Sequence, residues 1–374
     1  MNPILFTLLL TGVFSLLNMY ISKRLISRLS ISSKYKCYFR IFLYLNLFGI
    51  FLYALARYYV EFPSWLYFLF SLPIGVLFLL FCTAILYDTS HLFLSFTPMQ
   101  EKRRSFFKNS LDIGAVVTAV AITSHSIYNA RTVVLEDKEI KITNLHHSYK
   151  ILQLSDIHIG GLIDAAFIKD IVKRVNDCKP DLVVITGDLV DIGIKKAHHI
   201  LEEFKALQSK YGTYYIVGNH EYFHGIEVII KRVKELGIRV LENENVYIGE
   251  EGKGFNLAGV YDIFGYRAQH HIPDINKALT NRLENSPTIL LAHQPKFLQE
   301  IYDFQKIDLV LSGHTHGGQL YPFRFLVSLQ QPYISGLHQH TPITQIYVNK
   351  GTGFWGPPMR LGASAEITEI ILNT

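Results

Sequence analysis

The sequence has little cysteine, with only Cys37, Cys82 and Cys178 among 374 residues. No two of them have the short spacing of a metal-binding pair, and they do not form the dense, even pattern of a disulfide framework. The scarcity of cysteine therefore argues against a fold held together by disulfides or by a cysteine-ligated structural zinc ion.

The positive net charge of +5 does not indicate a nucleic-acid-binding protein. Much of the lysine and arginine lies in short segments beside apolar runs, where membrane proteins place these residues. We therefore expect the membrane bilayer, and not nucleic acid, to be a partner of this chain.

Long apolar runs are concentrated in the first 130 residues. Three of them, and a weaker fourth that carries Asp112 and His125, have about the 20 residues needed to cross a bilayer. Small residues support a span by the fourth run. The sequence predicts transmembrane helices within 1–130 (about 3–21, 41–60, 65–87 and 111–130), a linker at 131–147 and one globular domain at 148–374.

The loops between the apolar runs differ in charge. The segment Lys23–Arg40 has six basic and no acidic residues, and Asp88–Ser110 carries a second basic cluster. Both are predicted to be cytoplasmic, whereas the nearly neutral turn Arg57–Ser64 is predicted outside. Lys102–Lys108 either resembles a twin-arginine export signal or is a basic loop. Either interpretation places the part beyond Arg131 on the extracytoplasmic face of the inner or plasma membrane.

After residue 148 the sequence alternates between strand-like and helix-like runs. This order predicts an α/β domain with parallel pairing near its start, and the strand-rich end predicts a second, mixed sheet. The predicted helices are 165–176, 199–207 and 226–236, and the predicted strands are 149–155, 181–186, 213–217, 255–260, 288–292, 309–311, 345–348 and 367–372.

Polar side chains follow five of these strands at the point where each strand ends. Functional groups gather at the carboxyl ends of strands in open α/β sheets. A buried polar group without a partner costs about 2–7 kcal/mol, so these groups need a common partner. Their number exceeds one tetrahedral site and predicts two sites with mixed nitrogen and oxygen ligands, which suit Mn, Fe or Zn. The candidate ligands are Asp156, His158, Asp188, Asn219, His293, His314 and His316.

The same residues form an ordered set of motifs. The order Asp-x-His, Gly-Asp-x-x-Asp, Gly-Asn-His-Glu, His and Gly-His-x-His resembles the calcineurin-like metallophosphoesterase superfamily. Later stretches, such as Gly317-Gly318-Gln319 and Tyr347–Gly353, are similar to its membrane-anchored, exported bacterial branch of the YkuE/YaeI type. All five motifs are intact, at Asp156–His158, Gly187–Asp191, Gly218–Glu221, His293 and Gly313–His316.

This resemblance implies a four-layer αββα sandwich of two mixed sheets and assigns roles to the site residues. Asp188 would be shared by both metal ions, and His220 would be catalytic, either contacting a phosphate oxygen or protonating the leaving group. Asp191 and Glu221 would orient ligands, and Arg360 and His338 are weaker candidates for substrate contacts. The implied ligands are Asp156, His158, Asp188 and His316 for one metal and Asp188, Asn219, His293 and His314 for the other.

The predicted function is hydrolysis of phosphodiester or pyrophosphate bonds, with lipid-linked substrates favoured by the membrane anchor, through attack of a hydroxide that bridges two metal ions. One alternative is a UDP-2,3-diacylglucosamine pyrophosphatase of lipid A synthesis, whose cytoplasmic substrate conflicts with the predicted topology. Another is a non-catalytic scaffold on a phosphoesterase fold, which is less favoured because no motif residue is missing.

Overall fold

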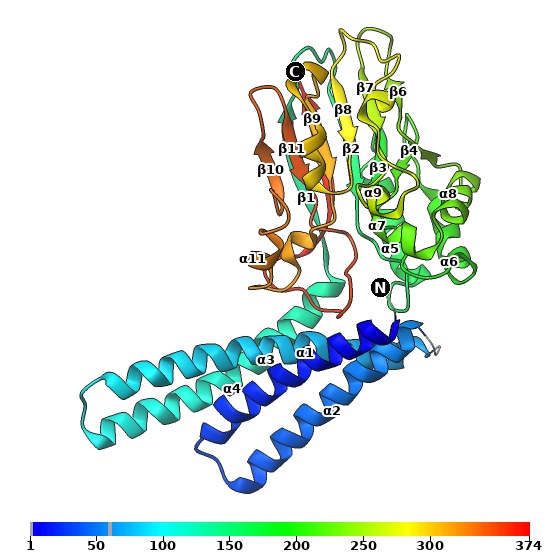
Figure 1. The fold of residues 1–374 in the computed structure, drawn as a ribbon. Coiled ribbons are helices and arrows are strands. Elements are labelled where there is room, and N and C mark those ends of the chain that lie inside the picture. Colours follow the sequence, from blue (N-terminus) through cyan, green and yellow to red (C-terminus); the bar gives the residue numbers. More distant parts are fainter. Residues whose placement is uncertain (1–2, 59–61) are drawn as a thin grey trace. The chain divides into compact units, whose positions relative to one another are not determined.

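The structure is a computed structural model that describes residues 3–58 and 62–374 (Figure 1). Its contacts divide the chain into two units. The helical unit contains the residues up to Asn129 together with Gly356–Leu361, and the α/β unit contains Ala130–Trp355 and Gly362–Thr374. Each unit is described by itself below.

Among its described residues, the helical unit contains four long helices, and each is long and apolar enough to cross a membrane. The fourth begins at Glu101, ten residues before the predicted apolar run, so that the basic cluster forms its first turns. The predicted turn Arg57–Ser64 includes residues 59–61, which lie outside the described residues. The elements are α1 (Pro3–Arg24), η1 (Ile26–Arg28), α2 (Ser33–Tyr58), α3 (Ser64–Phe96) and α4 (Glu101–Arg131).

The acidic residue of the fourth apolar run is fully paired inside the helical unit. Asp112 accepts hydrogen bonds from the Tyr87 hydroxyl at 2.7 Å and from the Ser30 backbone N–H at 2.7 Å. The Lys108 ammonium, one helical turn away, lies 3.0 Å from Asp112 Oδ2, the oxygen that also accepts the Ser30 N–H. Because an unpaired charge is costly within a membrane, this pairing makes a spanning α4 compatible with Asp112.

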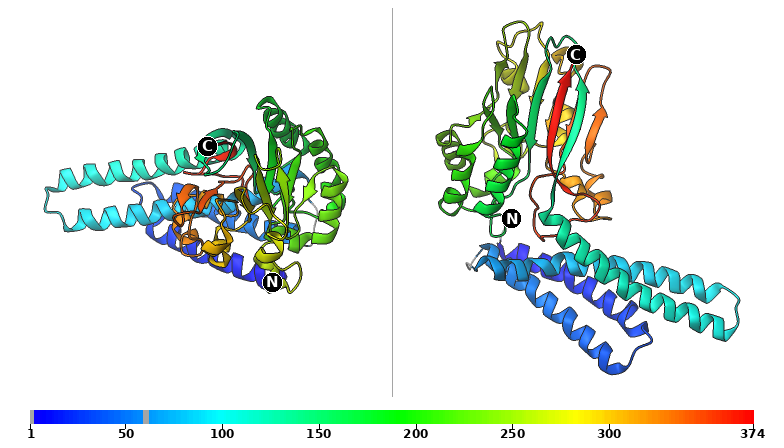
Figure 2. Two further views of the ribbon diagram at one scale, coloured as in Figure 1. Left: turned by 90° about the horizontal axis from the view of Figure 1, so that it is seen from above. Right: turned by 180° about the vertical axis from the view of Figure 1, so that it is seen from behind.

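Two six-stranded mixed sheets form the centre of the α/β unit, as the sequence analysis predicts. In the first sheet, β2, β3, β4 and β5 are parallel, and the last strand β12 lies between β1 and β2 (Figure 2). In the second, β7, β8, β9 and β11 are parallel and flanked by antiparallel β6 and β10. The first sheet has the order β1 (Val133–Lys141), β12 (Ala365–Asn373), β2 (Tyr149–Leu154), β3 (Leu182–Thr186), β4 (Thr213–Ile216) and β5 (Arg239–Val240). The second has the order β10 (Gly336–Gln339), β11 (Gln345–Val348), β9 (Leu309–Ser312), β8 (Thr288–Leu291), β7 (Phe255–Gly259) and β6 (Glu244–Ile248).

Three apolar cores show that the sheets are stacked and covered on both outer faces. Within β2, Ile151 packs into the core between the sheets, whereas Leu152 and Leu154 pack against the helices of the first sheet. In β8, Ile289 faces the same central core and Leu290 faces the outer layer of the second sheet. This alternation within fully buried strands produces the predicted αββα layers. The helical elements around the sheets are α5 (Ala165–Asp177), α6 (Ile194–Leu201), η2 (Glu202–Ala206), α7 (Asn219–His224), α8 (Ile226–Glu235), α9 (Phe264–Ala268), α10 (Ile275–Ala278), η3 (Pro295–Glu300), η4 (Asp303–Gln305), η5 (His316–Gly318) and α11 (Arg324–Val327).

Two sequence predictions differ from the structure. The expected linker at 131–147 contains β1, which pairs in parallel with β12 over nine residues and so is part of the first sheet. The expected helix at 199–207 begins earlier, at Ile194, and continues after Leu201 as the 3-10 helix η2. Its apolar face uses Ala197, Ile200 and Leu201, so the helical periodicity starts before the segment that was predicted.

Candidate metal centre

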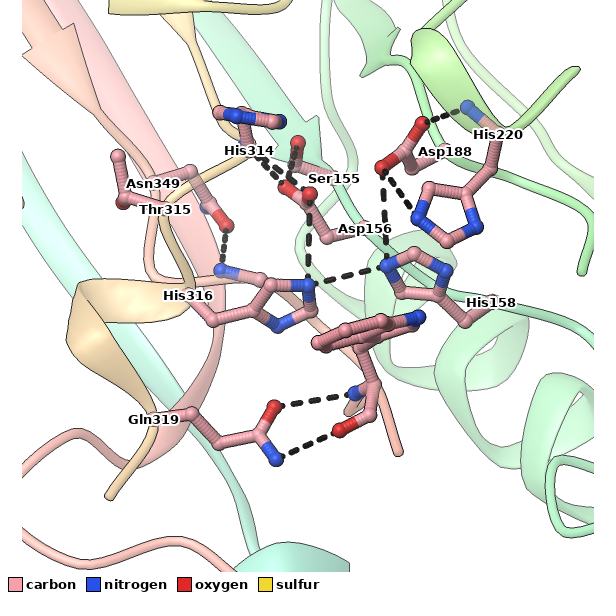
Figure 3. Close-up of polar contacts among 12 residues, drawn as sticks. Ser155, Asp156, His158, Asp188, His220, His314, Thr315, His316, Gln319 and Asn349 are labelled. Atoms are coloured by element: carbon pink, nitrogen blue, oxygen red, sulfur yellow. Dashed lines mark hydrogen bonds and ion pairs between the residues drawn. The ribbon is translucent and has the colours of Figure 1, made fainter. Parts of the chain in front are cut away.

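The candidate ligands lie at the carboxyl ends of five parallel strands from both sheets. Asp156 and His158 follow β2, and Asp188 follows β3. Asn219 and His220 begin α7 directly after β4. The second sheet supplies His293 after β8 and the pair His314 and His316 after β9. The two sheets therefore deliver their polar side chains to one place. Figure 3 shows contacts that join Asp156, His158, Asp188, His220, His314 and His316.

The backbone that carries these residues is strained. Five of the seven candidate ligands have a left-handed φ angle, although none of them is glycine. Such conformations cost about 1–3 kcal/mol each and gather at functional sites, where surrounding structure holds them in place. The φ angles are 50° for Asp156, 54° for His158, 50° for Asp188, 70° for His314 and 49° for His316.

The first group of ligands combines Asp156, His158 and His316. The Nε2 atoms of the two imidazoles lie 3.0 Å apart, and His316 Nε2 is 3.6 Å from Asp156 Oδ1. Burial, helped by the positive charge of nearby His220, lowers the pKa of His158 to about 3. A neutral imidazole offers a lone pair to a cation. These three ligand atoms lie within 4.8 Å of one another, so one cation could contact all three.

The second group combines Asp188, His293 and His314, whose ligand atoms also lie within 4.8 Å of one another. His293 Nδ1 donates to the Thr186 carbonyl oxygen at 2.7 Å, which leaves Nε2 facing Asp188 Oδ2 at 3.3 Å. The same Nε2 lies 3.3 Å from Asn219 Oδ1. A hydrogen bond from the outer ring nitrogen fixes a ligand histidine in this way in known metal sites.

Asp188 lies between the two groups. Its Oδ2 atom is 3.3 Å from His293 Nε2 in the second group and 3.8 Å from His158 Nε2 in the first. Burial would raise the pKa of Asp188, but the positive charges of His293 and His220 outweigh it and hold the pKa well below its usual value. Asp188 is therefore an ionised carboxylate with one oxygen facing both groups, which is the arrangement that a bridging ligand requires.

His220 is oriented by a carboxylate on its outer side. Its Nδ1 atom lies 2.6 Å from Asp191 Oδ1, and its Nε2 atom lies 3.9 Å from Asp188 Oδ2. His224 Nε2 contacts the same Asp191 oxygen at 3.2 Å. Burial would lower the pKa of His220, but Asp188 and Asp191 outweigh it and raise the pKa to about 9. His158, Asp191 and His220 also form a possible ligand group, so the geometry alone offers a competing role for His220.

Glu221 builds the loop that carries Asp188. It is fully buried, and its carboxylate accepts four backbone N–H groups, from Asp188, Leu189, Val190 and Gly218, at 2.7–3.2 Å. Gly218 must be glycine, because a Cβ atom at this position would collide with the Asp188 carboxylate. Asp191 contacts the ring of His220, and Glu221 contacts the backbone of Asp188 and Gly218. The role of both residues in orienting ligands stays a prediction.

Some residues of the site were not found from the sequence. The Ser155 hydroxyl donates to Asp156 Oδ2 at 2.5 Å. Asp262, which is almost fully buried, follows β7 and accepts hydrogen bonds from Phe264 N–H and the Gln294 amide on the same oxygen. The rule that indicates the candidate ligands, a polar residue just after a strand, also applies to Asp262.

The contacts described for the two weaker substrate candidates lie within their own units. Arg360 is buried, and it belongs to the segment Gly356–Leu361 of the helical unit. Its backbone N–H donates to the Ser126 carbonyl in the same unit at 2.8 Å. His338 lies in β10, where Nε2 donates to the Ser335 carbonyl at 2.8 Å and the ring stacks on Tyr333. Substrate contacts by Arg360 and His338 stay predictions.

Comparison with known proteins agrees with the geometry. Residues 149–318 match the family model described as calcineurin-like phosphoesterase. A protein of Helicobacter pylori (strain ATCC 700392 / 26695) named as an uncharacterized metallophosphoesterase is 42% identical over 300 residues, which are 78% of this chain and 80% of that one. The chain belongs to the calcineurin-like phosphoesterase family.

Relatives in this phosphoesterase family also share the helical part. A Campylobacter jejuni metallophosphoesterase is 34% identical over 99% of this chain and 98% of its own. A Danio rerio protein named as a transmembrane protein with a metallophosphoesterase domain is 32% identical over 83% of this chain and 74% of its own. The chain is therefore a metal-dependent phosphoester hydrolase associated with a membrane, and the scaffold alternative is set aside. The ligand groups described above fit the divalent ions that the family uses.

Proposed function

We propose that this chain is a membrane-anchored phosphoesterase that holds two divalent cations, Mn, Fe or Zn, and hydrolyses phosphodiester or pyrophosphate bonds. The observation that carries the proposal is the position of the ionised Asp188 carboxylate between two histidine groups. A carboxylate oxygen shared in this way suits a pair of cations more than a single one. The proposed ligands are Asp156, His158, Asp188 and His316 for one cation and Asp188, Asn219, His293 and His314 for the other.

The residues around the two groups support hydrolysis at phosphorus. When bound, a pair of divalent cations lowers the pKa of water toward neutrality and neutralises charge on the phosphate oxygens. Asp191 fixes His220 through Nδ1, so that Nε2 faces the region beside Asp188. In that position the imidazole can contact a phosphate oxygen or give a proton to the leaving oxygen.

The helical unit supports a position at the membrane surface. Basic residues lie at the end of α1 and near the start of α2, and a second basic cluster lies in the first turns of α4. The positive-inside rule then assigns these ends to the cytoplasm and the α/β unit to the extracytoplasmic face. The proposal includes four transmembrane spans within residues 1–130. It also includes lipid-linked phosphate esters as substrates, because the anchor holds the site near the bilayer.

The first test is metal content and activity of the full-length chain in detergent. After chelation and titration with Mn, we expect about two bound cations per chain and Mn-dependent hydrolysis of bis(p-nitrophenyl) phosphate. Asp170→Asn, which changes an exposed acid on α5, should bind and hydrolyse like the wild type. Saturation at one cation per chain would contradict the two-site proposal.

The second test is the topology of the chain. An alkaline phosphatase fused after Thr374 should be active in cells, whereas a fluorescent protein that folds only in the cytoplasm should not be when fused there. Fusions after Lys36, in the first basic segment, should give the opposite result and serve as the control. A cytoplasmic C-terminus would reverse the orientation and would favour the UDP-2,3-diacylglucosamine pyrophosphatase alternative, which no observation on the described residues supports.

A further inference from the structure

Two aromatic rings that are about half exposed flank the buried His220. The Phe223 ring centroid lies 5.7 Å from that of His220 at an interplanar angle of 82°, and Trp355 lies 6.0 Å away at 76°. Phe223 is 55% and Trp355 44% exposed, whereas His220 is 8% exposed. The rings therefore combine a large apolar surface with one polar group at the edge of the metal centre.

The two rings come from different parts of the α/β unit. Phe223 lies in α7, three residues after His220, and residues three apart occupy the same face of a helix. Trp355 lies in the segment between β11 and β12. The two rings therefore flank His220 because of the tertiary fold, and not because they are neighbours in the sequence.

Trp355 is held in place by a turn of the metal centre. The Gln319 side chain makes both hydrogen bonds: its Nε2 donates to the Trp355 backbone carbonyl at 2.8 Å, and its Oε1 accepts from the Trp355 backbone N–H at 3.0 Å (Figure 3 draws both contacts of Gln319). Gln319 directly follows η5, which begins at the candidate ligand His316. The turn that places His316 therefore also fixes the backbone of Trp355.

Phe223 packs against a second aromatic ring, that of Phe264. Its ring packs on Phe264 at 4.8 Å, and the Phe264 backbone N–H donates to Asp262 Oδ1 at 2.7 Å. Gln294, next to the candidate ligand His293, donates to the same oxygen at 2.9 Å. Both aromatic rings are thus tied to loops that carry metal-centre residues. Such fixed apolar surfaces beside a few convergent polar groups are typical of ligand sites.

We propose that Trp355 and Phe223 bind the leaving group of the substrate and that this group carries an apolar body, an alkyl chain or an aromatic ring, next to the ester oxygen. Gln319 is a positioning residue for Trp355. This inference rests on the proposed function, since it takes the P–O bond next to His220 as the bond that breaks. In that step a P–O bond to the oxygen of water forms and the bond to the leaving oxygen breaks, and water supplies one hydrogen to each product.

The test uses full-length protein in detergent with Mn and a series of methyl alkyl phosphates in which the alkyl group is propyl, butyl, pentyl or hexyl. The released alcohol is identified, so that cleavage on the alkyl side is counted apart from methanol release. Each added methylene should raise kcat/KM for the alkyl side by about fourfold if it is fully buried, so hexyl should exceed propyl by roughly 60-fold. A methyl benzyl phosphate tests whether the apolar body is an aromatic ring or an alkyl chain. If the site favours an aromatic ring, kcat/KM for release of benzyl alcohol should exceed that for release of butanol from the butyl ester.

Trp355→Ala and Phe223→Ala should each reduce the ratio of kcat/KM for the hexyl ester to that for the propyl ester, so that the two values differ by no more than a few fold. The matched control is Trp65→Ala, which removes the other tryptophan of the chain, exposed near the start of α3, and should keep the wild-type ratio. Gln319→Ala should lower the ratio in part. With Trp65→Phe as background, it should also make the emission of Trp355 more accessible to acrylamide.

Three outcomes separate the claims. A wild-type protein that hydrolyses propyl and hexyl esters equally well overturns the leaving-group site but leaves the proposed function intact. If Trp355→Ala and Phe223→Ala both keep the wild-type hexyl-to-propyl ratio of kcat/KM and unfold at the wild-type temperature, the assignment of these two residues is overturned. Wild-type protein that hydrolyses no ester, including bis(p-nitrophenyl) phosphate, overturns the proposed function and this inference with it.

Discussion

Asp188→Asn is expected to lower kcat/KM for bis(p-nitrophenyl) phosphate by about 10³-fold or more, because metal ions supply several kcal/mol of charge stabilisation and 1.36 kcal/mol corresponds to tenfold in rate. The asparagine keeps the size of the side chain and an oxygen that can accept the His220 backbone N–H, which donates to Asp188 Oδ1 at 2.9 Å. It removes the negative charge that faces His293 and His158. Both proposed cation sites lose a ligand charge at once.

Metal binding and folding must be measured beside the activity of Asp188→Asn. A bound cation stabilises the folded state, so chelation should lower the unfolding midpoint of the wild type and change that of the variant much less. Asp170→Asn again serves as the matched control, because its carboxylate is exposed on α5. If Asp188→Asn kept two tightly bound cations and near wild-type turnover, the carboxylate would not be a shared ligand.

The arrangement of the site could be predicted because its residues follow short buried strands. The strands β2, β3, β8 and β9 are short, largely apolar and buried, and a candidate ligand lies two residues after the end of each. In a parallel sheet such ends meet at one edge, so order along the chain predicts proximity in space. The family resemblance groups His316 with Asp156 and His158, and His314 with His293 and Asp188, and the structure brings the side chains of each group within reach of one cation. The full ligand sets, with Asp188 shared and Asn219 included, stay a prediction.

What the sequence did not predict depends on contacts between distant segments. The segment Val133–Lys141 carries five charged residues and lies in the predicted linker, but it pairs with β12, more than 220 residues later. The pattern of apolar residues in either strand does not predict which strand it pairs with. The same holds for Gln319 and Trp355, which lie 36 residues apart and meet only through loop conformation. Pairing of this kind is a property of the folded chain and has no local pattern.

His220→Ala is expected to keep both cations and to lose about 10²- to 10⁴-fold in turnover, the usual range for a general acid or base. Asp191 accepts from Nδ1, so the alanine variant removes an imidazole whose Nε2 faces the metal centre, while the seven proposed ligands stay in place. His198→Ala is the matched control, because His198 lies exposed on α6. Metal content that falls by half would show instead that His220 is a ligand, as its grouping with His158 and Asp191 allows.

The size of the loss across substrates separates the two roles that His220 could have. If the imidazole protonates the leaving oxygen, its removal should cost far more for an alkyl leaving group, which needs a proton, than for p-nitrophenolate, which leaves as an anion. If it only contacts a phosphate oxygen, both substrates should lose turnover to the same extent. We expect the unequal loss, because Phe223 and Trp355 place an apolar surface directly beside His220, on the side where the leaving group is proposed to bind. Equal losses for hexyl and p-nitrophenyl esters would move His220 to the phosphate oxygens and would require the leaving group to lie elsewhere.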